Sequence, residues 1–157
     1  MRIEAKLKEL GLALPEHPLS LQLPFPWVRI RGKRAFISGH GPQAPDGSLA
    51  KPLGKVGAEV SLEEGQEAAR LVALAMLGSL KRELGDLDCV TAWLRVFGMV
   101  NSAPDFTRQP EVINGFSHLI LSLYGEQAGA HARSAVGMAA LPFNIPVEIE
   151  AEVEIDS

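Results

Sequence analysis

Residues 147–156 read VEIEAEVEID, so apolar and acidic residues alternate without a break. In a β-strand successive side chains point to opposite faces. This period of two therefore places the apolar residues on one face and five carboxylates, from Glu148 to Asp156, on the other. The stretch predicts a strand whose apolar face is buried against the rest of the domain.

The segments before this strand predict a mixed α+β fold with the element order ββαβαββ. Two strands flank a turn at Gly32-Lys33, and a helix begins at the capping box 61–64 and runs to about Leu84. The other elements are a strand over 90–100, a helix over about 110–124 and a strand over 133–141. We expect both long helices on one face of the sheet, because two helices are enough to cover one face only.

The strand over 90–100 is apolar on both of its faces. One parity carries residues such as Val96 and Val100, and the other carries Trp93, Phe97 and Met99. A strand that is apolar on both faces is covered on both faces. Since the two helices cover one face, we expect a second copy of the chain to cover the other, which predicts a homo-oligomer packed sheet to sheet.

The first 25 residues differ from the rest of the chain. Residues 3–10 have the spacing of a short amphipathic helix, and a connector rich in proline follows, with Pro15, Pro18, Pro24 and Pro26. We expect residues 1–25 to form an arm packed on a single domain of residues 26–157. Within that domain, residues 41–60 predict a long loop rich in glycine and proline.

The composition argues against several classes of protein. The 157 residues are 46% hydrophobic, and 15 basic against 19 acidic side chains give a net charge of −4, which disfavours a nucleic-acid partner. The single cysteine, Cys89, excludes an internal disulfide framework, and the four histidines lack metal-ligand spacing, so we expect no metal site. No stretch reaches the ~20 apolar residues of a membrane span and no signal-peptide core is evident, which predicts a cytoplasmic protein without a membrane partner.

Arg133 is the strongest candidate for ligand binding. It opens a strand of small residues such as Ala135, and a guanidinium with free space around it can hold a carboxylate through two hydrogen bonds. The alternative is a structural ion pair with the glutamates of 147–156, as neighbours in a hairpin. Glu148, the first of these glutamates, is best placed to orient a water. His40 is either a pocket base or an ordinary loop histidine.

Three stretches carry a resemblance to a known family. Residues 132–136 (ARSAV), Leu141-Pro142 and residues 147–151 (VEIEA) resemble the signature of the YjgF/RidA family of reactive intermediate (enamine/imine) deaminases, whose older name is the L-PSP endoribonuclease family. Further agreement comes from residues 37–39, 66–69 and 105–106. The resemblance implies a fold like that of the bacillus chorismate mutase, assembled as a homotrimer with ligand clefts between subunits.

The resemblance also implies roles for individual residues. Arg133 matches the arginine that grips the substrate carboxylate, Glu148 the glutamate that positions the hydrolytic water, and Gly39 the glycine that ends the second strand at the cleft. Ala135 stands where the family often has a cysteine. Phe25 or Trp27 lies in the region of the family's cleft tyrosine. These departures and the N-terminal extension indicate a divergent branch.

The leading hypothesis is hydrolysis of a small 2-imino or 2-enamine acid to the 2-keto acid and ammonia, with no cofactor or metal. Arg133 would bind the carboxylate and Glu148 would orient the water. A second hypothesis is a non-catalytic trimer that binds small carboxylate metabolites through Arg133. The third is an endoribonuclease, against which the acidic balance and the lack of a histidine pair argue.

Overall fold

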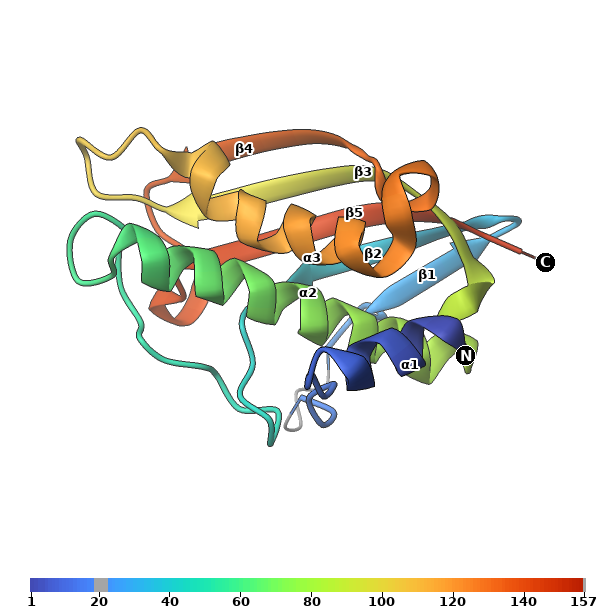
Figure 1. The fold of residues 1–157 in the computed structure, drawn as a ribbon. Coiled ribbons are helices and arrows are strands. Elements are labelled where there is room, and N and C mark those ends of the chain that lie inside the picture. The colour runs from blue at the N-terminus through green and yellow to red at the C-terminus, as the bar shows by residue number, and fades with distance from the viewer. Residues whose placement is uncertain (19–22, 157) are drawn as a thin grey trace.

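The computed structural model describes residues 1–18 and 23–156 (Figure 1). Part of the predicted connector, residues 19–22, lies outside the described residues. Within them the chain forms a five-stranded sheet and three α-helices, α1 (Arg2–Glu9), α2 (Leu62–Leu84) and α3 (Gln109–Gly129). Two short 3₁₀ turns, Leu87–Cys89 and Pro142–Asn144, precede the third and the fifth strand. No helix of the described part is both long and apolar enough to cross a bilayer.

The strands of the sheet follow the order β1-β2-β5-β3-β4. They are β1 (Val28–Arg31), β2 (Arg34–His40), β3 (Val90–Asn101), β4 (Ala132–Met138) and β5 (Val147–Ile155). β4 pairs with β3 in parallel, whereas β1–β2, β2–β5 and β5–β3 are antiparallel. The predicted order ββαβαββ and the mixed α+β class are therefore confirmed, and the last strand of the chain lies in the centre of the sheet.

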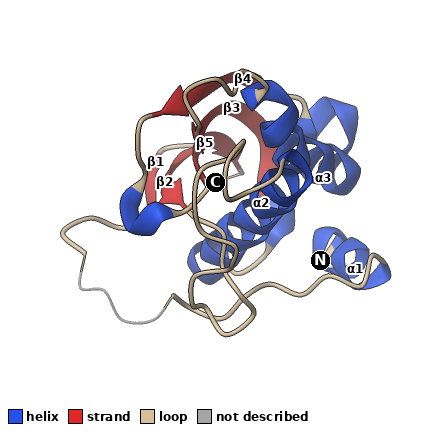
Figure 2. Ribbon diagram, turned by 90° about the vertical axis from the view of Figure 1, so that its left-hand side faces the viewer, coloured by secondary structure: helices blue, strands red, loops and turns tan. Residues whose placement is uncertain are grey.

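Both long helices lie on one face of the sheet, as predicted (Figure 2). The capping box at the start of α2 is formed: Ser61 Oγ accepts from the Glu64 amide, and Glu64 accepts from the Ser61 amide. α2 and α3 touch where Gly115 faces the Gln66 carbonyl, which any larger side chain would overlap. Gly125 in α3 has a φ of 78°, and one further short turn follows it before the chain enters β4.

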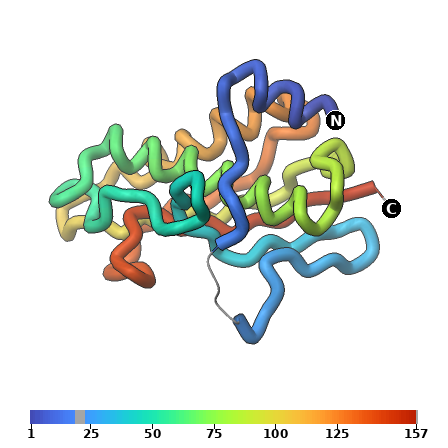
Figure 3. The backbone as a smooth tube through the Cα atoms, turned by 90° about the horizontal axis from the view of Figure 1, so that it is seen from below, coloured from blue at the N-terminus to red at the C-terminus, as the bar shows by residue number. Residues whose placement is uncertain are grey.

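The N-terminal segment packs on the helical layer. Ile3 and Leu7 of α1 are buried in the same hydrophobic core as the two long helices. The chain then runs back across α2, where the Pro15 carbonyl lies beside Gly78 and the Glu16 amide donates to the Pro45 carbonyl at 2.9 Å (Figure 3).

The prediction for Trp93 was wrong. Its side chain is 1% exposed and faces the helices, where its ring meets the rings of Phe116 and Tyr124 edge-on at 5.9 Å and 5.8 Å. The cause is an interruption of the pairing of β3 with β5 on both sides of Trp93, which changes the parity of the strand. Phe97 and Met99, beyond the interruption, do face away from the helices, opposite Glu150 and Glu148 of β5.

The expected hairpin between the Arg133 strand and the glutamate strand was also wrong. β5 lies between β2 and β3, and β4 lies beyond β3 at the edge of the sheet. Arg133 therefore does not neighbour the glutamates. The ion pair that the structure does contain on this glutamate row joins Arg34 of β2 to Glu152, with 2.9 Å between Nη1 and Oε1.

Candidate functional site

Arg133 lies on the edge strand β4 and points toward α3. Its Nη1 donates to Asn114 Oδ1 at 2.8 Å and to Ser117 Oγ at 3.1 Å, and its Nη2 donates to the Pro110 carbonyl at 3.3 Å. Partial burial lowers the pKa of the guanidinium, which nevertheless remains charged at neutral pH. Polar contacts on one side of the guanidinium therefore fix its orientation without neutralising it.

An open pocket of about 270 Å³ lies in front of this arginine. Its lining residues are Asn114, Ser117, Leu121, Ala130, His131 and Arg133. In the part of the chain that the structure describes, no acceptor faces the Nε–H of Arg133. A cationic fork at the wall of an open pocket is suited to a small anion such as a carboxylate.

His131 and Ser117 form a second pair in the same pocket. His131 Nε2 lies 2.8 Å from Ser117 Oγ, and its Nδ1 lies 2.7 Å from the Gly129 carbonyl oxygen. Burial and, to a smaller extent, the charge of Arg133 lower the pKa of His131. The sequence interpretation missed this pair and Asn114, although two signals were present. His131 and Arg133 are two residues apart, so in an extended chain their side chains point to the same face. Asn114 and Ser117 are three residues apart, which places them on the same face of a helix.

Gly39 and Glu148 meet at a different place. A side chain at Gly39 would overlap Oε2 of Glu148, so the glycine leaves room for this half-buried carboxylate. Burial raises the pKa of Glu148, and the neighbouring Glu150 adds to the effect. The structure therefore brings together two of the residues predicted for the site and gives one of them altered acidity.

The two predicted aromatic residues pack at the end of β2, beside His40. Trp27 packs against His40, with 4.7 Å between ring centroids, and Phe25 meets Trp27 edge-on at 6.5 Å. The Ser38 amide and hydroxyl donate to the carbonyls of Trp27 and Pro26 at 2.9 Å and 2.8 Å. These bonds fasten the segment that carries the aromatic residues to the end of β2, which carries Gly39.

His40 is a structural residue rather than a pocket base. It is 2% exposed, and its ring bonds to the Ser38 carbonyl at 2.6 Å through Nδ1 and to Ser79 Oγ at 2.8 Å through Nε2. Burial lowers its pKa to about 4, so it is neutral at physiological pH. Its contacts join the end of β2 to α2 and hold Gly39 in place.

Arg133 and Glu148 lie on opposite faces of the sheet. Met99 pairs with Val136 on one side and with Glu148 on the other, so these three side chains share the face that the helices leave open. Arg133, three residues before Val136, points to the helix-covered face, as does Ala135. Within one chain the structure thus separates the predicted site into an Arg133 group and a Glu148 group.

The family comparison covers the part of the chain that carries both groups. The model of a family described as "YjgF/chorismate_mutase-like, putative endoribonuclease" matches residues 4–151. The chain belongs to the YjgF family. The match includes Gly39, Arg133 and Glu148, and it begins within α1, so most of the N-terminal segment is also part of the YjgF match.

Similar proteins are found in distant organisms. Protein TCP17 of Trypanosoma cruzi is 40% identical over 156 residues, covering 99% of this chain and 96% of that protein. Atu1372 of Agrobacterium tumefaciens, a protein of unknown function, is 43% identical with a TM-score of 0.88. The match covers 99% of this chain and 94% of Atu1372. The structure of E. coli TdcF with bound serine is 20% identical to this chain and has a TM-score of 0.60. The match covers 92% of this chain and 99% of TdcF, which shares the YjgF fold.

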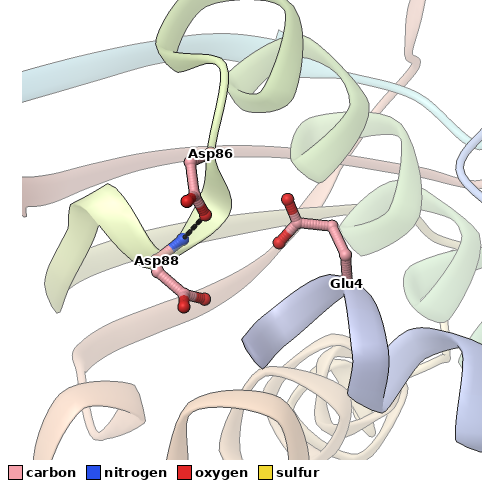
Figure 4. Close-up of side chains that lie close together, drawn as sticks. All are labelled: Glu4, Asp86 and Asp88. Carbon is pink, nitrogen blue, oxygen red and sulfur yellow. Dashed lines mark hydrogen bonds between the residues drawn. The ribbon is translucent and has the colours of Figure 1, made fainter. Parts of the chain in front are cut away.

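Two other features of this YjgF chain lie away from the motif residues. A groove of about 560 Å³ between α2 and α3 includes Arg70, which already pairs with Glu67 at 2.7 Å. Glu4, Asp86 and Asp88 lie close together (Figure 4). Their charges already have partners, because Lys81 Nζ lies 2.7 Å from Glu4 and the Met1 amine lies 2.8 Å from Asp88. We assign a ligand to neither feature.

Proposed function

We propose that this protein hydrolyses small 2-imino or 2-enamine acids to 2-keto acids and ammonia, in clefts between the subunits of a homotrimer. Arg133 holds the substrate carboxylate and fixes the orientation of C2. A water adds to C2 of the iminium tautomer, and the resulting carbinolamine expels ammonia. Because such imines already hydrolyse in water, a small number of polar groups is sufficient for useful acceleration.

The observation that carries this proposal is the fixed orientation of the charged Arg133 guanidinium in the wall of an open pocket. Asn114, Ser117 and the Pro110 carbonyl hold the guanidinium, and Asn114 and Ser117 line the pocket of about 270 Å³ together with it. A carboxylate arriving from the pocket meets a charged donor that is already oriented, which reduces the entropy lost on binding. The serine bound to the related TdcF supports a ligand of amino-acid size.

The trimer supplies what one chain lacks. Glu148 faces the open side of the sheet and Arg133 the covered side, so we place the Arg133 group of one subunit against the Glu148 group of the next. The open face also carries apolar side chains that need cover, among them Phe36, which is 42% exposed, Phe97 and Met99. A closed ring of three copies covers this face and forms three equivalent clefts.

Glu148 is suited to handle the water. Its half-buried carboxylate can accept hydrogen bonds from a water and so fix the orientation of that water. The contact with Gly39 holds its side chain in one place. In this proposal Glu148 and backbone groups near Gly39 orient the water toward C2, and Trp27 and Phe25 form an apolar wall nearby.

The second candidate is a trimer that binds carboxylate metabolites without turning them over. It is favoured by Ala135, which offers no thiol, and by Phe25 and Trp27, which offer no hydroxyl in the region of the cleft tyrosine. In that case a 2-keto acid would bind in calorimetry while imine hydrolysis stayed at the rate of the buffer.

The test generates 2-iminobutanoate in situ and measures 2-oxobutanoate formation with and without the protein. We expect the wild-type protein to accelerate 2-oxobutanoate formation clearly, and Arg133→Ala to lower this rate by about 100-fold. Arg133→Lys should keep part of the rate, because lysine retains the charge but not the two-pronged hydrogen bonding of the guanidinium. Arg70 of α2, a half-buried arginine paired with Glu67, provides the matched control, and Arg70→Ala should keep full activity.

Buffer-rate hydrolysis by the wild-type protein would refute the deaminase proposal. So would equal acceleration by Arg133→Ala. Cleavage of RNA that survives both Arg133→Ala and stringent purification would instead support the endoribonuclease named in the family description.

A further inference from the structure

We propose that Ser117 and His131 are the proton-transfer pair for the reaction at Arg133, with Ser117 contacting the attacking water and His131 as the base behind it. This inference rests on the proposed deaminase function and assigns a role to two residues outside the motif stretches that carry the family resemblance.

The hydrogen-bond directions in this pair follow from its contacts. The Gly129 carbonyl oxygen can only accept, so the His131 Nδ1 that lies 2.7 Å from it carries the proton. Nε2 of the neutral ring is then an acceptor, and the Ser117 hydroxyl at 2.8 Å donates to it. Arg133 Nη1 donates to the same Ser117 oxygen at 3.1 Å. The result is a directed chain from Arg133 through Ser117 to His131.

This chain has the parts of an activated hydroxyl. A base accepts from the hydroxyl, a backbone carbonyl orients the base, and a cation stabilises negative charge that develops on the oxygen. The ring of Phe116 meets His131 edge-on at 6.3 Å and helps to fix its position. α3 supplies Ser117, the neighbouring β4 supplies Arg133, and His131 lies in the short connection between these two elements. The packing of α3 on β4 therefore holds the three side chains together (Figure 1).

His131 is the group of the Arg133 pocket that can change protonation near neutral pH. Of the six residues lining it, Arg133 stays protonated, and Asn114, Ser117, Leu121 and Ala130 do not titrate in this range. Arg133 is the charged group that acts on His131, and together with burial it favours the neutral ring. Glu148 of the same chain faces the opposite side of the sheet. The proposed trimer brings Glu148 of the partner subunit to the cleft, and this carboxyl, whose pKa is raised by burial, is still present in His131→Ala. Only the part of the pH dependence that His131→Ala removes therefore belongs to His131.

In the proposed reaction, water adds to the iminium carbon before ammonia leaves. The water oxygen bonds to C2, the C=N pair moves to nitrogen, and the water proton passes to Ser117 as the Ser117 proton passes to His131 Nε2. The imidazolium then returns its proton through Ser117 to the amino group of the carbinolamine. The C–N bond breaks with its electron pair on ammonia, which takes the remaining hydroxyl proton as the C=O bond forms. The net change is iminium plus water to keto acid plus ammonium.

The test compares His131→Ala and Ser117→Ala with His118→Gln, an exposed histidine next to Ser117 that lines the separate groove between α2 and α3. We expect kcat to fall by about 100-fold in both pocket variants, while the Kd of 2-oxobutanoate in calorimetry changes less than about threefold and His118→Gln behaves as wild type. Added imidazole should restore part of the His131→Ala rate.

A pH profile distinguishes proton transfer from a structural role. The neutral ring is the active form, so wild-type kcat should fall as pH drops through the pKa of His131, below the usual value of about 6.5. His131→Ala should lack that fall. This inference alone would be overturned if His131→Ala had the same kcat as the wild type. It would also be overturned if Ser117→Ala kept its kcat while its Kd for 2-oxobutanoate became tenfold weaker. Buffer-rate hydrolysis by the wild type would overturn the deaminase function together with it.

Discussion

The two faces of the sheet are built from the same strands but differ in how they are covered. On the helix side, Trp93, Val96 and Ile149 are fully buried by α2 and α3. On the open side, Phe36 and Phe97 retain exposure beside charged residues such as Glu150. The covered face therefore provides the stability of the single chain, whereas the open face is suited to assembly, and each face carries one half of the candidate site.

The largest effect should come from the covered face. Trp93→Ala removes a buried indole that contacts Phe116 and Tyr124, and we expect a loss of about 3–5 kcal/mol in the free energy of unfolding. Urea denaturation followed by circular dichroism measures it. A loss below about 1 kcal/mol would contradict the position of Trp93 in the core.

A charge on the open face should affect assembly more than folding. Phe97→Asp places a carboxylate opposite Glu150, and we expect the proposed trimer to dissociate while the secondary structure is kept. Light scattering of Phe97→Asp and of Lys8→Asp, a control on the exposed side of α1, gives the masses. An unchanged trimer in Phe97→Asp would show that this face is not an interface.

The smallest effect concerns Glu148. A folded-state pKa raised above the unfolded value means that the ionised carboxylate destabilises the fold at neutral pH. Glu148→Gln should therefore be more stable than wild type at pH 7, by about 0.5 kcal/mol or less, and the difference should shrink as pH falls through the folded and then the unfolded pKa. Thermal melts at pH 7 and pH 4 measure it, and a less stable variant at pH 7 would contradict the shift.

The sequence predicted the features that local periodicity determines. The alternation of 147–156, the capping box of α2 and the element order all follow from neighbours in the chain, and the structure has them. Trp93 could not be assigned to a face, because the irregular pairing around it comes from the partner strand β5. Uninterrupted alternation along residues 90–100 would place Trp93 on the face away from the helices, which is wrong.

The candidate site was predictable in its motif residues but not in its arrangement. The residue pattern singled out Arg133 and Glu148, and the family resemblance added Gly39, whereas the insertion of β5 between β2 and β3 is a long-range pairing that no local pattern reveals. That insertion moves Arg133 away from the glutamates. Asn114, Ser117 and His131 surround it because α3 packs on β4, which is again a tertiary contact.

The most direct test of the account mixes two inactive variants. Arg133→Ala and Glu148→Gln are unfolded together, refolded as mixed trimers, and assayed for 2-iminobutanoate hydrolysis. If each cleft takes Arg133 from one subunit and Glu148 from its neighbour, about a quarter of the clefts in a 1:1 mixture contain both native residues. Activity should then return to about a quarter of the wild-type value. Mixed trimers that remain as inactive as the separate variants would contradict a site shared between subunits.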